Sequence, residues 1–346
     1  MALDVVLVLV SLVVILAGAE FFTNSVEWLG VHFKLGHGAV GSVLAAVGTA
    51  MPETMIPIVA IVFGGSADSH DVGIGAILGA PFLLSTAAFA VTGLGIIAFA
   101  RHRRSGTTMR VDPSVLRRDI GYFFAVYLFA IVSSFIPVHT IKLGIAGVML
   151  ALYVLYVIRT FSDGSDDVAA DEEAAEEEEL QALRLHRVLG RSGHPALPFI
   201  LAQLAGSLAL IIFGAHLFVG HLTSISEELG LPALALALVI APLATELPEK
   251  FNSIIWVRQG KDTLAMGNIS GAMVFQSCVP VAVGMVFTDW ELDETALVSA
   301  AIALLSTGIV YLSIRKRGEL SAYVLARAGL LWVGFVAYVV VKLAIE

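Results

Sequence analysis

Hydrophobic residues gather into long segments along this chain, and short polar segments separate them. A run of about 20 apolar residues is long enough to cross a bilayer as a helix. Ten segments of this kind can be marked: Ala2–Phe22, Ala39–Phe63, Val72–Ala100, Ile120–Phe135, Thr140–Val157, Pro198–Leu222, Pro232–Val257, Thr263–Phe287, Thr295–Ile314 and Leu320–Leu343. The pattern predicts an all-α membrane protein with ten transmembrane helices.

The composition agrees with a membrane protein. The chain of 346 residues is 58% hydrophobic and 14% charged, with a mean hydropathy of +0.90, whereas a soluble domain has about 25% charged residues. The lipid bilayer is the expected partner, and no basic surface interleaved with aromatic residues suggests nucleic acid. The single cysteine, Cys278, excludes an internal disulfide. No basic region with a cleavage site precedes the first segment, so we expect that segment to be retained as a span.

Positively charged residues are concentrated after the odd-numbered segments. They are Arg101, Arg103, Arg104, Arg110, Arg117, Arg118, Arg184, Arg187, Arg191, Arg258, Lys261, Arg315, Lys316 and Arg317. The alternate loops are acidic, with Lys142 nearly alone as a cation. Because Lys and Arg favour the cytoplasmic side of a membrane, we expect both termini outside, with the membrane being a prokaryotic plasma membrane.

A strongly acidic stretch divides the apolar segments into two groups of five. Ser162–Leu180 contains ten acidic residues and no apolar periodicity, which is typical of a solvated linker. The chain is therefore expected to consist of a five-helix repeat over 1–161, an acidic cytoplasmic linker over 162–194 and a second five-helix repeat over 195–346. An odd number of spans makes the two repeats cross the membrane in opposite directions.

The two groups also match in sequence. Ile15–Phe22 resembles Ile211–Phe218, and Gly48–Glu53 resembles Ala244–Glu249, both at an offset of 196 residues. A third match relates Gly75–Ala80 to Gly267–Ala272 at an offset of 192 residues. Because the three matches occur in the same order in both groups, they predict an inverted repeat. Inverted repeats with interrupted helices at matching positions are typical of secondary transporters with a site at the midplane.

The second of these matches places a proline directly before a glutamate in each half. Proline has no N–H and crowds the residue four positions earlier, so the carbonyls of Gly48 and Ala244 lose their helical partners. We therefore predict broken helices at spans two and seven. Glu53 and Glu249 would then be ionisable groups that lie inside the membrane beside a helix break. Ionisable residues in such a position are candidate functional residues.

Spacing brings hydroxyl groups to the same helix faces as these glutamates. Thr49 and Glu53 are four residues apart, as are Thr245 and Glu249. Two-fold pseudosymmetry would bring both sets together, and with the carbonyls of Gly48 and Ala244 they would form a metal site made of oxygen ligands. Two carboxylates suit Ca²⁺, and the absence of thiolate or imidazole argues against zinc or copper. The ions are cargo, and no resident cofactor is expected.

Glu246 adds a third carboxylate in the second half, and two interpretations of it stay open. Lys250 follows four residues later, so the two residues can form an ion pair along the helix. Alternatively Glu246 carries protons, because burial and the charge of Glu249 favour its protonated form. Asn252 and Ser253 extend the same polar face, and Glu20 is a candidate for lining the pathway.

These residues resemble the cation/calcium exchanger superfamily, which includes the sodium/calcium exchangers. Its hallmark is two inverted repeats, each with Gly-Thr-Ser-Leu-Pro-Glu on one helix and Gly-Ser-Asn-x-x-Asn or Asp on the next. The resemblance implies that Glu53 and Glu249 bind Ca²⁺ and, in alternation, Na⁺ or protons, and that Thr49 and Thr245 contribute ligands.

The chain departs from this motif at several positions. Ala50 and Glu246 replace the first serine in the two repeats, and Gly79–Leu84 lacks the polar residues of the second motif. In the second repeat Gln276, helped by Asn268 and Ser277, keeps the polarity. In the sodium-coupled members the polar residues at these positions serve sodium sites. Their replacement here puts the coupling of three sodium ions in doubt.

The sequence therefore predicts an antiporter that exchanges Ca²⁺, or a similar divalent cation, for H⁺ or Na⁺ by alternating access. A Na⁺/H⁺ or other monovalent cation antiporter on the same scaffold, or a passive cation channel, are the alternatives. An enzyme is not expected, because the chain contains neither His-Glu-x-x-His nor Gly-x-Ser-x-Gly.

Overall fold

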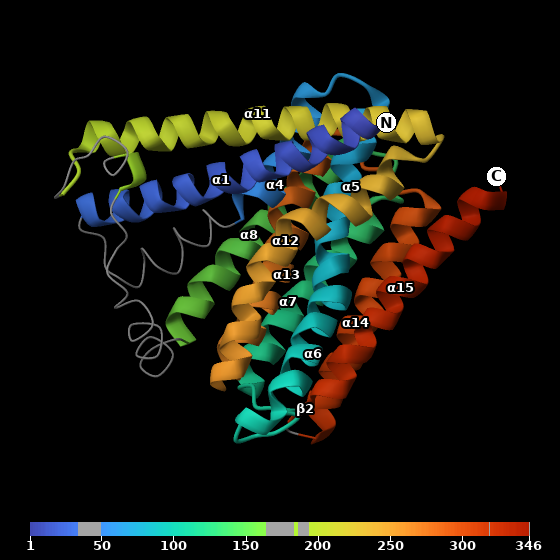
Figure 1. Ribbon diagram of the computed structural model, residues 1–346. Coiled ribbons are helices and arrows are strands. Elements are labelled where there is room, and N and C mark those ends of the chain that lie inside the picture. The colour runs from blue at the N-terminus through green and yellow to red at the C-terminus, as the bar shows by residue number, and fades with distance from the viewer. Residues whose placement is uncertain (34–49, 164–182, 186–193, 318, 346) are drawn as a thin grey trace.

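The structure is a computed structural model that describes residues 1–33, 50–163, 183–185, 194–317 and 319–345, without the side chains of 161–163, 247–252, 315–317 and 343–344. Figure 1 shows an almost wholly helical chain. Its elements are α1 (Ala2–His32), α4 (Met51–Ile58), η2 (Val59–Phe63), α5 (Ala67–Leu83), η3 (Leu84–Ala88), α6 (Phe89–Phe99), η4 (Ala100–His102), β1 (Thr108–Met109), α7 (Pro113–Ser133), α8 (His139–Asp163), α11 (Leu197–Leu229), α12 (Ala233–Gln259), α13 (Asp262–Phe287), α14 (Glu294–Arg317), β2 (Leu320–Ser321) and α15 (Ala322–Ile345).

Seven of the described helices are long and apolar enough to cross a membrane. They are Ala2–His32, Ala67–His102, His139–Thr160, Leu197–Leu229, Asp262–Phe287, Glu294–Ile314 and Ala322–Lys342. The shorter apolar stretches Met51–Phe63 and Ala233–Glu246 lie within the predicted second and seventh spans. Helix α7 overlaps the predicted fourth span but is not among these apolar helices. The prediction of an all-helical membrane protein is confirmed.

Several predicted boundaries were wrong for local reasons. Helix α1 continues to His32, ten residues beyond the predicted end of the first span. Helix α7 begins at Pro113 because the Asp112 side chain accepts hydrogen bonds from the backbone N–H and the hydroxyl of Ser114. These bonds lower the pKa of the Asp112 carboxyl, which precedes the helix.

The predicted break in the seventh span was also wrong. Helix α12 is continuous from Ala233 to Gln259, through Pro248. A proline removes one hydrogen bond and kinks a helix, but flanking residues keep their own bonds and packed neighbours hold the helix together. The carbonyl of Ala244 still lacks a donor at Pro248, so it stays a candidate ligand within a continuous helix. The first half differs, because α4 begins only at Met51.

Two π-helical turns interrupt the first half. Val59–Phe63 follows Pro57, and Leu84–Ala88 follows Pro81. A π turn adds one residue to a helical turn and is frequent at functional sites. The Leu84–Ala88 turn packs against α12, α13, α14 and α15, and the hydroxyl of Ser306 on α14 donates to the carbonyl of Ser85.

Most of the helices form a bundle, and one pair of helices lies across it. In Figure 1, α1 and α11 lie side by side and cross the direction of the other helices. One core cluster fills the space between this pair and α4, α5 and α12, and a second unites α5 to α8 with α13 to α15. Helix α12 belongs to both clusters, with Ala237 in one and Leu238 in the other.

The packing partners of the first half recur in the second half. Helix α5 packs on α12, and α13 packs on α4; α6 packs on α15, and α13 packs on α8. The pairs α5 with α14 and α13 with α7 repeat the relation once more. The two halves thus use matching helix positions to contact each other, and the stretches that carry Glu53 and Glu246 lie where the halves meet.

An ion pair with many hydrogen bonds closes one end of the bundle, called here the strand end because β1 and β2 pair there. Arg103 Nη2 lies 2.7 Å from Asp262 Oδ2, and neither side chain is more than 3% exposed. Arg103 also donates to the carbonyls of Val257 and Thr108, while the backbone N–H of Arg110 donates to Asp262. These contacts connect the α6–α7 loop to the turn between α12 and α13.

Candidate functional site

Glu53 lies in the first turn of α4 and is buried, with 6% of its surface exposed. The helix begins here because Pro52 occupies an early position where no N–H is needed. The carbonyl of Ala50 accepts from both the N–H and the hydroxyl of Thr54, at 3.2 and 2.7 Å. A carboxylate in the first helical turn is stabilised by the positive end of the helix dipole.

Thr245 and Glu246 lie on α12 and are buried, with 2% and 1% of their surfaces exposed. Helix α12 packs against both α4 and α13. The hydroxyl of Thr245 donates to the carbonyl of Ala241 at 3.1 Å, which leaves the lone pairs of its oxygen available to a cation. Ala244 is partly buried beside the core cluster of α1, α4 and α11.

Gln276 of α13 connects a second helix to this group. Its Nε2 donates to Oε1 of Glu246 at 3.3 Å, and the Gln276 side chain is 2% exposed. The carbonyl oxygen Oε1 of Gln276 accepts no hydrogen bond within the described part of the chain. An amide oxygen of this kind is a suitable ligand for a hard cation.

The structure does not describe the side chains of the remaining predicted ligands. Gly48 and Thr49 are not described, and for Glu249, Lys250 and Asn252 only the backbone within α12 is described. Among the described residues, no three His, Cys, Asp or Glu side chains converge on a possible metal site. The roles assigned to these residues therefore stay predictions, and the described core of the site consists of Glu53, Thr245, Glu246 and Gln276.

Glycines hold α12 close to α5 beside this group. A Cβ on Gly75 would lie 2.4 Å from the carbonyl oxygen of Leu234, and a Cβ on Gly79 would lie 2.3 Å from that of Leu238. The sequence analysis matched these glycines between the repeats without assigning them a packing role. This close contact sets how α5 and α12, the helix that carries Glu246, are aligned along their length.

The other predicted residues are separate from this core. Asn268 is half-buried on α13, and Ser277 is buried, with its hydroxyl donating to the carbonyl of Met273. Glu20 is largely exposed on α1 and forms an ion pair with Arg184, from the described segment 183–185.

A buried carboxylate that the sequence analysis missed is Asp119. It accepts from the hydroxyl of Ser270 at 2.6 Å, the hydroxyl of Tyr156 at 3.1 Å and Arg118 Nε at 3.1 Å. The predicted fourth span began one residue later, so Asp119 was assigned to a loop. Its bonds tie α7 and α8 to α13, which indicates that Asp119 holds these helices together.

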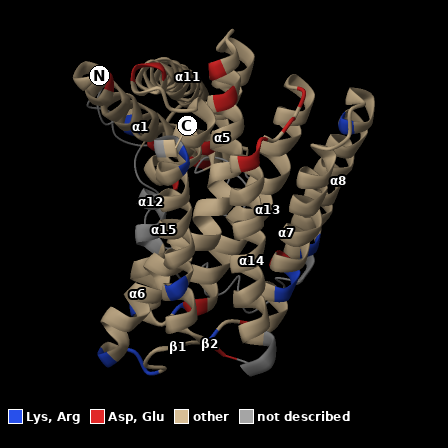
Figure 2. Ribbon diagram, turned by 90° about the vertical axis from the view of Figure 1, so that its right-hand side faces the viewer, with Lys and Arg blue, Asp and Glu red and all other residues tan. Residues whose placement is uncertain are grey.

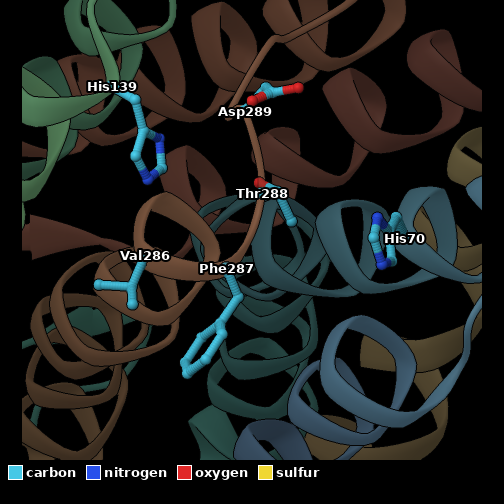
Figure 3. Close-up of a pocket in the computed structure, with 6 residues that line it drawn as sticks. All are labelled: His70, His139, Val286, Phe287, Thr288 and Asp289. Atoms are coloured by element: carbon cyan, nitrogen blue, oxygen red, sulfur yellow. The ribbon is translucent and has the colours of Figure 1, made fainter.

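A pocket of about 300 Å³ lies at the end of the bundle opposite the strands. It is lined by His70, His139, Val286, Phe287, Thr288 and Asp289. Figure 3 shows the two imidazoles on either side of Thr288 in that view. The pocket residues include neither the buried glutamates nor Gln276, so we do not include the pocket in the site.

Comparisons with known proteins agree on one family. The sequence profile of the family "Sodium/calcium exchanger protein" matches residues 3–161 and 199–343. The inner membrane protein YrbG of Escherichia coli is 23% identical over 316 residues, covering 90% of this chain and 88% of YrbG.

Two solved structures share the fold. The H⁺/Ca²⁺ exchanger CAX superposes with a TM-score of 0.69 at 16% identity, covering 99% of this chain and 87% of CAX. The sodium-calcium exchanger NCX_Mj superposes with a TM-score of 0.53 at 20% identity, covering 97% of this chain and 98% of NCX_Mj.

Proposed function

The chain belongs to the sodium/calcium exchanger protein family, and on that premise we propose that it is an antiporter exchanging Ca²⁺, or a similar divalent cation, for protons or Na⁺. Membership makes the protein a transporter and not an enzyme. The exchange would proceed by alternating access, with the cations reaching the site from one side of the membrane at a time.

The observation that carries this proposal is the burial of two glutamates on adjoining helices. Glu53 on α4 and Glu246 on α12 are 6% and 1% exposed, and these helices pack on each other. Carboxylates inside a membrane protein are costly and mark ion pathways. Glu249 lies three residues after Glu246 on the same helix face, so the proposed site gains a further carboxylate from α12.

The proposed site is made of oxygen ligands. Glu53 and Glu249 supply the charge, Thr49, Thr245 and the carbonyls of Gly48 and Ala244 complete the shell, and Gln276 orients Glu246. Oxygen ligands of this number suit Ca²⁺. Lys250, Asn252, Ser253 and Asn268 are assigned an accessory role on the same helices.

We further propose that ten spans form two inverted repeats, 1–161 and 195–346, with the acidic linker between them and both termini outside. The recurring helix contacts of the two halves support the repeat. Figure 2 shows blue Lys and Arg patches near the strand end and red patches on α5 and after α13 at the other end. The rule that Lys and Arg favour the cytoplasm makes the strand end cytoplasmic, and the likeness to YrbG favours a prokaryotic plasma membrane.

Protons are the favoured counter-ion. Two protons can replace one Ca²⁺ on two carboxylates without a new set of ligands. Na⁺ would need further oxygen ligands, but Ala80 and Leu84 are apolar and no more than 2% exposed. CAX, whose fold this chain shares, is described as an H⁺/Ca²⁺ exchanger.

The test is ⁴⁵Ca²⁺ uptake into proteoliposomes at fixed membrane potential. A proton gradient is expected to drive uptake, and a Na⁺ gradient is expected to have little effect. Strong dependence on Na⁺ without a response to pH would replace protons with Na⁺. Uptake that needs no opposing ion at all would indicate a channel and overturn the proposal of exchange.

A further inference from the structure

Five buried hydroxyl groups in the described helices have no hydrogen-bond partner, those of Thr92, Tyr127, Thr223, Ser253 and Tyr338, and two of them lie on the adjoining helices α6 and α12. Buried serines and threonines here commonly donate to a carbonyl of their own helix three or four residues earlier, as Thr86 does to Phe82 and Thr307 to Ala303. Thr92 on α6 and Ser253 on α12 are both fully buried. Within the described residues, neither hydroxyl oxygen has a hydrogen-bond partner.

Helix register places these two residues opposite each other. The nearest α12 atoms to a Cβ on Gly75 belong to Leu234 and Ala237, and those nearest a Cβ on Gly79 belong to Leu238 and Pro242. The two helix axes therefore run in parallel with an offset of about 161 residues. The same offset relates Thr92 to Ser253.

The contact of Gly95 confirms that this register continues beyond the π turn at Leu84–Ala88. A Cβ on Gly95 would lie 3.6 Å from Val257 and 3.7 Å from Ile254. Thr92 is three residues before Gly95, and Ser253 is four residues before Val257, so both lie on the facing sides of a closely packed helix pair.

The pair lies between the proposed site and the strand end. Ser253 follows Glu249 by four residues, which places it about 6 Å further along the same face of α12. The charged groups in that direction are Arg258 in the last turn of α12, Arg103, which donates to the carbonyl of Val257, and its partner Asp262. Glu246, Glu249 and Lys250 are the charged residues of α12 on the other side.

A buried hydroxyl without a hydrogen bond is unfavourable, because it has lost the bonds that it makes to water in the unfolded chain. Thr92 and Ser253 do not bond each other either, so a bridging partner would satisfy both. Two neutral oxygens provide no charge for a dehydrated Ca²⁺ or Na⁺. A water molecule is the suitable partner, since it donates and accepts as hydroxyls do.

We propose that Thr92 and Ser253 hold a water molecule between α6 and α12, forming a proton path between Glu249 and the cytoplasmic end. The path rests on the proposed function. In one transfer a proton binds the water, the water passes one of its own protons to Ser253, and Ser253 releases its hydroxyl proton toward Glu249. Each oxygen forms one O–H bond and loses one, so no other reactant is needed.

The test compares two modes of transport in proteoliposomes. Ca²⁺/H⁺ exchange is followed with ⁴⁵Ca²⁺ and an enclosed pH dye, and Ca²⁺/Ca²⁺ exchange, which moves no proton, with ⁴⁵Ca²⁺ alone. Thr92→Val keeps the side-chain shape and removes the hydroxyl. We expect it to slow Ca²⁺/H⁺ exchange at least tenfold while Ca²⁺/Ca²⁺ exchange changes less than twofold.

Two further variants serve as controls. Thr92→Ser keeps the hydroxyl and should retain proton-coupled exchange. Thr307→Val removes a buried hydroxyl that bonds its own helix and should leave both modes unchanged.

Three results would overturn the path: unchanged Ca²⁺/H⁺ exchange in Thr92→Val, an equal fall of both modes, or a wild type coupled to Na⁺ alone. That last result leaves cation exchange itself intact. A wild type without any exchange would instead overturn the proposed function.

Discussion

Gly18 of α1 lies directly against Ile211 of α11, since a Cβ on Gly18 would be only 2.7 Å from Cγ1 of Ile211. The reciprocal contact exists as well, because a Cβ on Gly214 would be 2.8 Å from Cγ1 of Ile15. Both pairs of equivalent residues, Gly18 with Gly214 and Ile15 with Ile211, are separated by 196 positions in the sequence. The sequence repeat is therefore expressed as a symmetric crossing of two helices.

Larger residues at this crossing should separate α1 from α11. Gly18→Val and Gly214→Val place methyl groups where Ile211 and Ile15 already lie, and overpacking of this kind costs about 1 to 3 kcal/mol. We expect a lower unfolding temperature of the purified protein in detergent, and slower transport. Gly206→Val and Gly220→Val on α11 are matched controls, because a Cβ there meets no described atom within 4 Å. Equal losses in all four variants would contradict the crossing.

The ion pair at the strand end should matter more than an exposed pair nearby. Arg103→Met leaves the Asp262 carboxylate buried beside an apolar side chain, and breaking a buried pair in this way costs about 3 to 5 kcal/mol. Arg110→Gln breaks the pair with Glu319, whose side chains are 71% and 50% exposed, and such pairs contribute about 0 to 1 kcal/mol. Thermal unfolding in detergent should show a large decrease for Arg103→Met only; similar values for both would refute this ranking.

The helices and the burial of Glu53 followed from the sequence because both depend on local pattern. Apolar segments of sufficient length gave the transmembrane helices, and a glutamate within such a segment is buried wherever the helix packs against others. The break predicted at Pro248 was wrong because the sequence shows the missing N–H but not the neighbours that keep α12 continuous.

Contacts between helices were not predictable in the same way. The bond of Gln276 to Glu246 depends on how α13 lies against α12. Asp119 was missed because its partners Tyr156 and Ser270 come from two other helices. The register between α6 and α12 likewise decides which residue faces Thr92, and one sequence contains no direct record of that register.

Single cysteines test the proposed orientation. In a Cys278→Ala background, Arg104→Cys places an exposed thiol after η4, and Glu291→Cys places one in the loop after α13. A membrane-impermeant maleimide added to intact cells should label Glu291→Cys, and should label Arg104→Cys only after the membrane is permeabilised. The reverse pattern would show that the termini face the cytoplasm. Labelling of both in intact cells would show that the membrane is leaky and require sealed vesicles of known orientation.

Glu246→Gln distinguishes the two roles open to this residue. If Glu246 carries protons, the variant should lose proton-driven Ca²⁺ uptake while Ca²⁺/Ca²⁺ exchange continues. If Glu246 instead pairs with Lys250, Glu246→Gln leaves the ammonium group without its partner, and the double variant Glu246→Gln with Lys250→Met should recover stability and proton-driven uptake. Persistence of proton-driven uptake in the single variant would exclude Glu246 as the carrier.

Glu53→Gln and Glu249→Gln are expected to abolish Ca²⁺ exchange. Each change keeps the size of the side chain and removes one negative charge, so a Ca²⁺ ion would lose a charged ligand in a setting where few others are present. Transport should fall at least a hundredfold, while size-exclusion profiles and unfolding temperatures show a folded protein. Glu227→Gln on the exposed end of α11 is the matched control and should transport at the wild-type rate. If either Glu53→Gln or Glu249→Gln carries Ca²⁺ at that rate, the cation binds elsewhere in the protein.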